Sequence, residues 1–336
     1  VVRQNYSVLI SIMVNFRVKL FLIWIFLVSL YICQYFLSSL YSQNEIKLKR
    51  WITNGTTNVL IQDSQKRKHY KILCWFLTSP DALEKKAKYV RDTWAKHCDI
   101  DLYMSSKDNK TFPTIGFNVT EGREHLAEKS RLAWTYVYDH YFNTADYFVK
   151  ADTDTFIVVE NLRKMLQNYD PKNAEFFGHM YYYGRRTKDG MFMAGGPGIV
   201  VSKEALRRLV ILGIKKATGN NKCIPDGGME DVKTCSCLYK TGSRPVNSTD
   251  HLGRERFLVW PPHNYIMRML PKWYIGMDAD KGKNQGVNCC SDHPIAFHYI
   301  DPQLMHTMYY MFYKTKVDAT FVKQRADLNR NVTHIV

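Results

Sequence analysis

Two carboxylates follow a strand-like apolar run near the middle of the chain. Residues 147–149 are apolar and lead through Lys150 to Asp152 and Asp154. Side chains alternate along a strand, so two carboxylates spaced two residues apart at a strand end face the same way. Such a pair offers hard oxygen ligands to Mn²⁺ or Mg²⁺ and leaves coordination positions for a diphosphate. The pattern alone is weak evidence because it also occurs in ordinary loops. Its weight therefore depends on the elements that position it.

Apolar runs of strand length alternate with amphipathic segments of helical length on both sides of this pair. Such alternation predicts a parallel α/β sheet, in which ligands collect at the carboxyl ends of the strands. The patterns predict strands at 71–77, 100–104, 147–151 and 192–201, and helices at 82–94, at 126–140, from 162 and after 202, with Asp81 and Ser202 as N-caps.

Three further segments carry residues that could do chemistry, and each has an ordinary structural explanation. The glycine-rich run at 195–198 suits a backbone that passes close to a ligand, or simply a bend. Glu230 and Asp231 precede a helix-like segment, where carboxylates also complement the helix dipole. His298 lies in an apolar strand-like run, where it is either a ligand or a hydrogen-bonded core histidine. Taken singly, these segments leave both interpretations open.

An uncharged apolar segment lies near the N-terminus. Residues 20–37 are eighteen residues without a charge, which is near the minimum for a membrane-spanning helix. No small-residue cleavage site follows, which favours an uncleaved anchor over a signal peptide. We expect a type II membrane protein with a cytosolic tail at 1–19, a transmembrane signal anchor at 20–41, a stem at 42–69 and a luminal domain at 70–336.

Cysteines and glycosylation sequons favour the secretory lumen for the part after the anchor. Seven of the eight cysteines follow the anchor, an odd number that leaves one thiol unpaired in an oxidising compartment. The close cysteine pairs 235/237 and 289/290 lack the two-residue gap usual in zinc sites. Asn-x-Ser/Thr sequons follow the anchor at Asn54, Asn109, Asn118, Asn247 and Asn331.

The net charge of +16 does not identify a partner by itself. Residues 1–50 hold six Lys and Arg against one Glu, so five of the sixteen charges lie mostly beside the anchor. The remainder is spread along the chain. This predicts a general preference for anions, which in the lumen are nucleotide diphosphates, acidic glycans and phospholipid surfaces.

Together and in this order, the segments resemble the β1,3-glycosyltransferases with a GT-A fold, and among them the core 1 synthase group, the glycoprotein-N-acetylgalactosamine β1,3-galactosyltransferases. The resemblance covers about residues 70–315, and the double cysteine before Ser-Asp and Phe-His-Tyr is its most discriminating element. The motifs are Val90-Arg-Asp-Thr-Trp94, Met104-Ser-Ser106, Glu121-Gly-Arg123 with Lys129, Lys150-Ala-Asp-Thr-Asp-Thr155, Phe177-Gly178, Gly195-Gly-Pro-Gly198, Met229-Glu-Asp-Val232, Cys289-Cys-Ser-Asp292 and Phe297-His-Tyr299.

The resemblance implies an α/β, GT-A type fold with a Rossmann-like, mostly parallel sheet, preceded by an N-terminal transmembrane helix. It implies that Asp152, Asp154 and His298 hold Mn²⁺, which suits an imidazole beside carboxylates better than Mg²⁺ does. Asp231 would be the general base that removes the proton from the acceptor's 3-hydroxyl. Trp273 would be an aromatic platform for the acceptor sugar, or else a partly buried core residue.

The same resemblance implies the donor pocket and the disulfide pairing. The residues implied to contact UDP are Met104, Glu121, Gly122, Arg123, Lys129, Asp152 and Tyr299. The implied disulfides are Cys74–Cys98, Cys223–Cys237 and a vicinal Cys289–Cys290, which leave Cys235 as the free thiol.

The implied activity is inverting transfer of galactose from UDP-galactose to the 3-hydroxyl of GalNAc-α-Ser/Thr, which makes the core 1 O-glycan (T antigen). We expect a Golgi membrane protein whose partners are a UDP-sugar, GalNAc-modified glycoprotein acceptors, the membrane and a second copy of the chain, with no nucleic acid. Two alternatives stay open. One is a β1,3-transferase for another UDP-sugar or acceptor, and the other is a non-catalytic luminal chaperone of such an enzyme.

Overall fold

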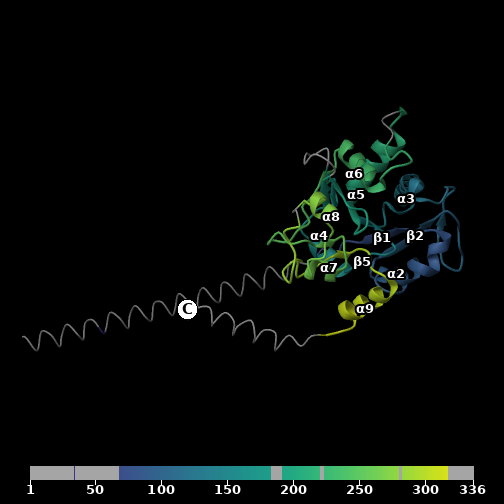
Figure 1. Cartoon of the computed structure of the whole chain (residues 1–336). Coiled ribbons are helices and arrows are strands. Elements are labelled where there is room, and N and C mark those ends of the chain that lie inside the picture. Colours follow the sequence, from purple (N-terminus) through teal and green to yellow (C-terminus); the bar gives the residue numbers. More distant parts are fainter. Residues whose placement is uncertain (1–33, 35–67, 183–190, 220–222, 280–281, 317–336) are drawn as a thin grey trace, which may run out of the picture. The chain divides into compact units, whose positions relative to one another are not determined.

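The computed structural model describes residue 34 and residues 68–182, 191–219, 223–279 and 282–316 (Figure 1). The predicted anchor therefore lies outside the described residues, apart from Gln34. Among the helices of the described ranges, none combines the length and the apolar character needed to cross a membrane. The division into tail, anchor, stem and catalytic domain stays a prediction.

A seven-stranded sheet forms the centre of the described chain, with strand order β10-β6-β9-β4-β1-β2-β3. Neighbouring strands run parallel except where β9 pairs antiparallel with β4 and with β6. The prediction of a mostly parallel sheet is confirmed, with β9 as the exception. The strands are β1 (Ile72–Leu77), β2 (Ile100–Ser105), β3 (Ile115–Gly116), β4 (Tyr147–Asp152), β6 (Glu175–Phe177), β9 (Ile199–Ser202) and β10 (Arg244–Pro245).

Two smaller sheets flank the large one. The first has the order β11-β12-β5 and the second pairs β7 with β8. The first sheet matters for the site because β12 delivers the segment that contains His298. The strands are β5 (Phe156–Ile157), β7 (Met180–Tyr182), β8 (Met191–Met193), β11 (Phe257–Leu258) and β12 (Ala296–Phe297).

Helices cover both faces of the large sheet. In Figure 1, α3, α5 and α6 lie above β1 and β2, while α2 and α9 lie below them. Such coverage is what buried parallel strands require. The helices are α2 (Lys88–Asp92), α3 (Leu126–Tyr141), α4 (Val159–Leu166), α5 (Lys203–Arg207), α6 (Glu230–Lys240), α7 (Pro262–Ile266), α8 (Lys272–Met277) and α9 (Pro302–Tyr313), with π-helical turns at Leu83–Ala87 and Arg208–Lys215 and 3₁₀ turns at Pro80–Ala82, Ala95–His97 and Arg123–His125.

Large aromatic side chains of β1 fill the core on both faces of the sheet. The Trp75 ring meets the edge of Trp134 on α3, with centroids 4.7 Å apart. Phe76 points to the opposite face, where its ring lies 5.4 Å from Trp94. All four rings, two from β1 and two that pack on it, are fully buried. The alternation of a strand explains how one short segment anchors two layers.

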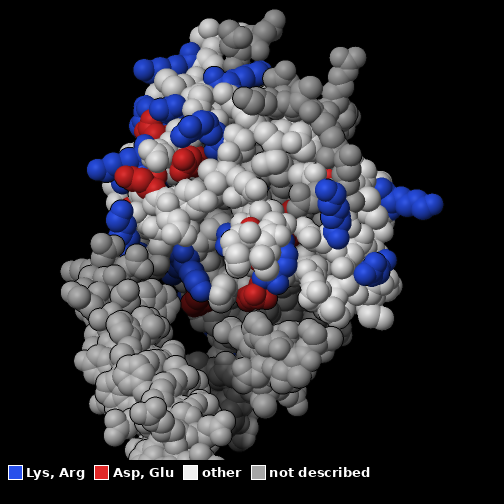
Figure 2. Space-filling view, turned by 90° about the vertical axis from the view of Figure 1, so that its left-hand side faces the viewer, with Lys and Arg blue, Asp and Glu red and all other residues white. Residues whose placement is uncertain are grey.

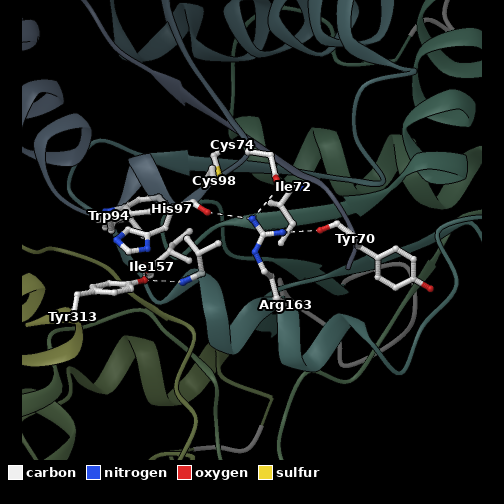
Figure 3. Close-up of a disulfide and its surroundings, with 12 residues drawn as sticks. Tyr70, Ile72, Cys74, Trp94, His97, Cys98, Ile157, Arg163 and Tyr313 are labelled. Carbon is white, nitrogen blue, oxygen red and sulfur yellow. Dashed lines mark hydrogen bonds and ion pairs between the residues drawn. A yellow bond between two sulfur atoms is a disulfide. The ribbon is translucent and has the colours of Figure 1, made fainter. Parts of the chain in front are cut away.

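The start of β1 is tied to α4 and to the segment before β2 (Figure 3). The Arg163 guanidinium donates to the carbonyl oxygens of Tyr70 at 2.6 Å and His97 at 3.1 Å. It also pairs with Asp99 Oδ2 at 2.7 Å. The Cys74–Cys98 disulfide lies beside these contacts. The end of the sheet opposite the site is therefore cross-linked covalently and by hydrogen bonds.

The predicted helix at 82–94 begins earlier and is less regular than expected. It starts with the 3₁₀ turn at Pro80, continues as a π-helical turn and becomes α-helical only at Lys88. Asp81 is not the N-cap, because Ser79 has the extended backbone that precedes the first turn and Asp81 lies inside that turn. Proline, which lacks an N–H, suits the first helical position and explains the shift.

The predicted strand at 192–201 is wrong as one element, because it divides into β8 and β9. Gly195 to Gly198 forms the connection between them, and Gly198 has a φ of +106° that L-residues rarely adopt. By contrast, the helix at 126–140 and the Ser202 cap are confirmed: the Ala205 N–H donates to Ser202 Oγ at 3.1 Å.

The three disulfides implied by the resemblance are confirmed. Cys74 pairs with Cys98, Cys223 with Cys237 and Cys289 with Cys290. Cys235 is free and fully buried, and burial raises the pKa of its thiol, which keeps it protonated and unreactive.

Candidate functional site

The carboxyl ends of β1, β2 and β4 meet at one edge of the large sheet. Leu77, the last residue of β1, is in register with Met104 on one side and Asp152 on the other. Asp152 ends its strand, whereas Asp154 lies in the turn that follows. Strand alternation therefore places only the first carboxylate. The second is positioned by the turn, and the Ile300 N–H holds the turn by donating to the Asp154 carbonyl at 2.9 Å.

Asp152, Asp154 and His298 form what we call the cleft triad. His298 Nε2 lies 3.1 Å from Asp154 Oδ1 and 3.7 Å from Asp152 Oδ2. One ligand atom from each residue lies within 4.8 Å of the other two. Three donors that converge on one point, two carboxylates and an imidazole, form a set suited to Mn²⁺.

Backbone features beside His298 hold its ring in place. A Cβ on Gly196 would lie 2.3 Å from the imidazole ring, so only glycine fits at this position. Tyr299 has a φ of 57°, a left-handed conformation that is uncommon for a bulky residue and typical of functional sites. The glycine-rich run is thus more than a bend, because it forms the wall against which the triad imidazole packs.

The charge state of Asp154 is fixed by its neighbours. Burial alone would raise the pKa of its carboxyl, but the hydrogen bond from His298 and the positive charge of Lys86 hold that pKa well below its usual range. Asp154 is therefore ionised at physiological pH, as a metal ligand must be.

Lys150 lies beneath the triad and is 3% exposed. Its ammonium lies 2.9 Å from Asp152 Oδ1 and 3.2 Å from Glu230 Oε2. It also lies 3.4 Å from the Gly195 carbonyl oxygen. Burial would lower the pKa of Lys150, but the charges of Asp152 and Glu230 raise it. This permanent cation fixes one oxygen of Asp152 and leaves the other facing His298.

The two adjacent carboxylates at the start of α6 have different environments. Glu230 is 8% exposed, and its Oε1 accepts a hydrogen bond from Ser130 at 2.6 Å while Oε2 pairs with Lys150. Asp231 is half-buried and lines, together with Asp152, Asp154 and His298, a cavity of about 610 Å³. Glu230 lines a neighbouring cavity of about 590 Å³, but both of its oxygens are paired with side chains, whereas Asp231 lines both cavities.

The environment of Asp231 makes it a better base than an ordinary aspartate. Burial, and secondly the charge of Glu230, raise the pKa of its carboxyl. The Gly195 N–H donates to Asp231 Oδ2 at 3.0 Å and fixes its orientation. A raised pKa brings a carboxylate closer to the range in which general bases work.

The residues expected to contact a nucleotide surround the same 610 Å³ cavity, with one exception. Glu121, Gly122, Arg123, Lys129 and Tyr299 all line it. The Lys129 ammonium donates to the Thr78 carbonyl at 2.9 Å and pairs with Glu121.

Met104 is the exception. It is fully buried and does not line the cavity, although its carbonyl accepts a hydrogen bond from Thr78 at 2.9 Å.

Trp273 is not among the residues that line the cavity, and 53% of its surface is exposed. A row of rings connects it to the triad. Its ring lies 6.1 Å from Trp260, which lies 4.7 Å from Tyr299, which in turn lies 4.0 Å from His298. An exposed indole at the end of such a row suits a sugar platform better than a core position.

A second histidine cluster, which we call the buried triad, lies away from the cleft. His179 Nε2 lies 3.2 Å from Asp278 Oδ1, and Nδ1 lies 3.4 Å from Glu255 Oε2. All three residues are at most 6% exposed. Burial would lower the pKa of His179, but the charge of Glu255 and the hydrogen bonds to both carboxylates raise it to about 10.

Sequence reasoning assigned no role to Lys86, Lys150 or Glu230. A lysine inside an otherwise apolar strand was a usable signal for Lys150, because a buried ammonium needs anionic partners. No comparable signal marked Lys86, because its segment has an ordinary amphipathic sequence pattern and only the fold brings the lysine to the site.

On the face drawn in Figure 2, Lys and Arg side chains are scattered, with Asp and Glu among them. The positive charge on this face does not form one continuous block. This agrees with the even spread seen along the sequence.

Residues 77–258 match the family model described as Fringe-like. The chain is 33% identical over 272 residues to glycoprotein-N-acetylgalactosamine 3-beta-galactosyltransferase 1 of Xenopus laevis, an alignment that covers 80% of this chain and 73% of the relative. It is 26% identical over 192 residues to a beta-1,3-glucosyltransferase of Mus musculus, covering 55% of this chain and 37% of that relative.

A solved structure with detectable similarity is the apo-form glycosyltransferase GlyE of Streptococcus pneumoniae TIGR4. The TM-score is 0.40 at 10% identity, and the match covers 74% of this chain and 61% of that chain.

Proposed function

Because the chain belongs to the Fringe-like family and to the group of glycoprotein-N-acetylgalactosamine 3-beta-galactosyltransferases, we propose that it transfers galactose from UDP-galactose to the 3-hydroxyl of GalNAc-α-Ser/Thr. The product is the core 1 O-glycan, formed with inversion from an α-linked donor to a β-linked product.

One observation carries this proposal. The cleft triad, the basic side chains Arg123 and Lys129, and the carboxylate of Asp231 all line one cavity of about 610 Å³. A nucleotide-sugar transferase needs a cation site, a diphosphate site and a base within reach of one sugar. The chaperone alternative needs none of these three.

Asp152, Asp154 and His298 are the residues that would hold Mn²⁺, which supplies positive charge for the leaving diphosphate when it is bound. Arg123 and Lys129 add fixed cations on the same wall of the cavity. Lys150 keeps the Asp152 carboxylate oriented, because one of its oxygens is already paired with the buried ammonium.

Asp231 takes the proton from the acceptor hydroxyl as the new bond forms. Its raised pKa, set by burial and by Glu230, increases its basicity. No second free carboxylate is required, because a single displacement on the face opposite UDP inverts the configuration. Glu230 is excluded from the role of base by its pairing with Lys150 and Ser130.

The cellular setting follows from the sequence. We propose a Golgi membrane protein with the segment at 20–37 as a type II anchor and the transferase domain in the lumen. The sequons at Asn109, Asn118 and Asn247 are on exposed residues, so attached glycans would face solvent. An endoglycosidase shift and resistance to alkaline carbonate extraction test this topology, and release of an unglycosylated protein by carbonate would refute it.

The direct test is a donor screen with the full-length chain in detergent. UDP-galactose, UDP-glucose and UDP-N-acetylglucosamine are each offered with a GalNAc-α-peptide and Mn²⁺. We expect transfer from UDP-galactose and a β1,3 linkage by NMR. The similarity to a beta-1,3-glucosyltransferase makes UDP-glucose the most informative competitor. Preference for another donor would replace the galactosyl assignment, and no transfer from any donor would favour a chaperone.

A further inference from the structure

Two lysines contact the two carboxylates of the cleft triad, and they are held very differently. Lys150 pairs with Asp152 and is fixed by Glu230 and the Gly195 carbonyl in a buried position. Lys86 pairs with Asp154 at 3.1 Å, and 53% of its side chain is exposed. Among the described residues, Asp154 is the carboxylate that holds the Lys86 ammonium. Lys150 is thus enclosed by several partners, whereas the Lys86 side chain is half exposed.

Among the described basic residues, Lys86 lines more of the cavities around the site than any other. It lines the cavity of about 610 Å³, a second cavity of about 590 Å³ that contains Asp231, and a third of about 310 Å³ beside Tyr299. It projects from the π-helical turn at Leu83–Ala87. A lysine carries its charge on a flexible four-carbon stem, so this ammonium can reach several points within the cavities that it lines.

The Lys86–Asp154 pair conflicts with the role of Asp154 as a metal ligand. The ammonium contacts Oδ2, and His298 contacts Oδ1. A divalent cation on this carboxylate repels an ammonium a few ångströms away and competes with it for the same charge. The ammonium must then take another partner, and a diphosphate in the shared cavity offers oxygens with the required charge.

We propose that Lys86 exchanges partners during substrate binding: it neutralises Asp154 before the divalent cation binds, and afterwards contacts the diphosphate of the nucleotide sugar. The inference rests on the proposed function, because it needs both the cation and the nucleotide. The partner exchange adds Lys86 to the residues that bind the diphosphate. It also gives a reason for the divalent cation to bind together with UDP.

The exchange predicts opposite effects of one substitution on two ligands. Removing the ammonium takes away a competitor of Mn²⁺, so Mn²⁺ alone should bind more tightly. The same removal takes away a diphosphate contact, so UDP should bind more weakly when Mn²⁺ is saturating. A lysine that only stabilises the fold would not produce effects of opposite sign.

The test is isothermal titration of the full-length chain in detergent, first with MnCl₂ alone and then with UDP at saturating MnCl₂. For Lys86→Met we expect Mn²⁺ affinity to rise about two- to fivefold, the range for a partly exposed ion pair. UDP affinity should fall about tenfold, as for a hydrogen bond between charged groups. Lys85→Met is the matched control, because Lys85 is exposed on the same turn and lines the 310 Å³ cavity but neither cavity with Asp231. It should change neither affinity.

Lys86→Arg keeps the charge and should restore most of the UDP affinity, which guards against a folding defect in the methionine variant. Weaker Mn²⁺ binding in Lys86→Met, or unchanged affinity for either ligand, overturns the partner exchange. Failure of the proposed function looks different. In that case the wild-type chain does not bind Mn²⁺ at the cleft triad, so Asp154→Ala leaves its Mn²⁺ binding unchanged.

Discussion

The cleft triad and the buried triad have the same kind of composition, one histidine and two carboxylates whose ligand atoms lie within 4.8 Å of one another. Their surroundings differ. In the cleft triad, 37% of the Asp152 side chain and 25% of the Asp154 side chain are exposed to a cavity. In the buried triad, His179 is fully buried and both carboxylates are nearly so.

The partners of each imidazole sharpen the contrast. In the buried triad, His179 Nδ1 donates to the Phe257 carbonyl at 2.9 Å, and the Tyr274 hydroxyl lies 3.4 Å from Nε2. Both nitrogens are therefore engaged, and the imidazolium lies between the two carboxylates and offsets part of their charge. A set of ligand-type side chains thus predicts a metal site only when a cation can reach it and its own imidazole is not already committed to both carboxylates.

The largest expected effect comes from removing one carboxylate of the cleft triad. Asp154→Ala should lower galactosyl transfer by about 10⁴-fold or more, because a metal ligand supports several kcal/mol of charge stabilisation. The melting temperature should change little, since the side chain is partly exposed. Transfer assays with Mn²⁺ and thermal unfolding measure both quantities. If Asp154→Ala retains full activity, the cleft triad is not the metal site and does not differ from the buried triad in function.

The next effect separates the cleft-facing carboxylate from its buried neighbour. Asp231→Asn should lower kcat by about 10²–10⁴-fold with UDP affinity little changed, because a general base acts on the acceptor. Steady-state kinetics and UDP titration measure these changes. Glu230→Gln is the comparison: we expect mainly a loss of stability, since its partner Lys150 is buried. If Glu230→Gln loses turnover and Asp231→Asn keeps it, the wrong carboxylate has been assigned.

Removing the histidine of the buried triad should act on stability. His179→Gln leaves two buried carboxylates without their cation and should lower the free energy of unfolding by about 3 kcal/mol. Activity per folded molecule at low temperature should stay close to that of the wild type. Denaturant unfolding and a transfer assay test the two statements. A normal stability with lost activity would mean that the buried triad takes part in function.

Metal removal should distinguish the triads in one experiment. Mn²⁺ at about 100 times its Kd should stabilise the wild type by about 2.7 kcal/mol, and EDTA should reverse this. His179→Gln should keep the Mn²⁺ effect, and Asp154→Ala should lose it. Thermal unfolding of each variant, with Mn²⁺ and with EDTA, measures this stabilisation. Loss of the Mn²⁺ effect in His179→Gln would place a cation in the buried triad.

The last effect is a pH dependence of stability. The pKa of His179 is raised to about 10 in the folded chain, against about 6.5 for an unperturbed histidine. Its stabilisation is therefore complete below about pH 6.5 and is lost as the pH rises through about 10. The difference in unfolding free energy between the wild type and His179→Gln should shrink across this interval. A difference that does not shrink across this interval would show that His179 is neutral in the folded chain.

The sequence predicted the elements whose patterns are local. The strand at β1, the helix α3 and the Ser202 cap follow from periodicity and from a hydroxyl at the right position. The resemblance added the disulfide pairs and brought His298, which is distant in sequence, to the Asp pair. These successes share one cause: each depends on neighbouring residues or on a motif that the chain preserves.

What the sequence did not predict depends on packing between distant segments. His179, Glu255 and Asp278 are isolated in the sequence, and only the fold brings them together. The break between β8 and β9 arises because Gly195 and Gly196 must pass Asp231 and His298 at close range. The roles of Lys150 and Glu230 likewise require knowing which face of each element is covered.

Gly196 has a consequence for natural variation in this chain. Any side chain at this position would meet the His298 ring at 2.3 Å, so even alanine must displace the imidazole or the loop. A Gly196 substitution should therefore resemble loss of a triad residue, because the imidazole can no longer take its place beside the two carboxylates. Although Gly196 has no side-chain donor atom, it belongs with Asp152, Asp154 and His298 among the positions where substitution should be most damaging.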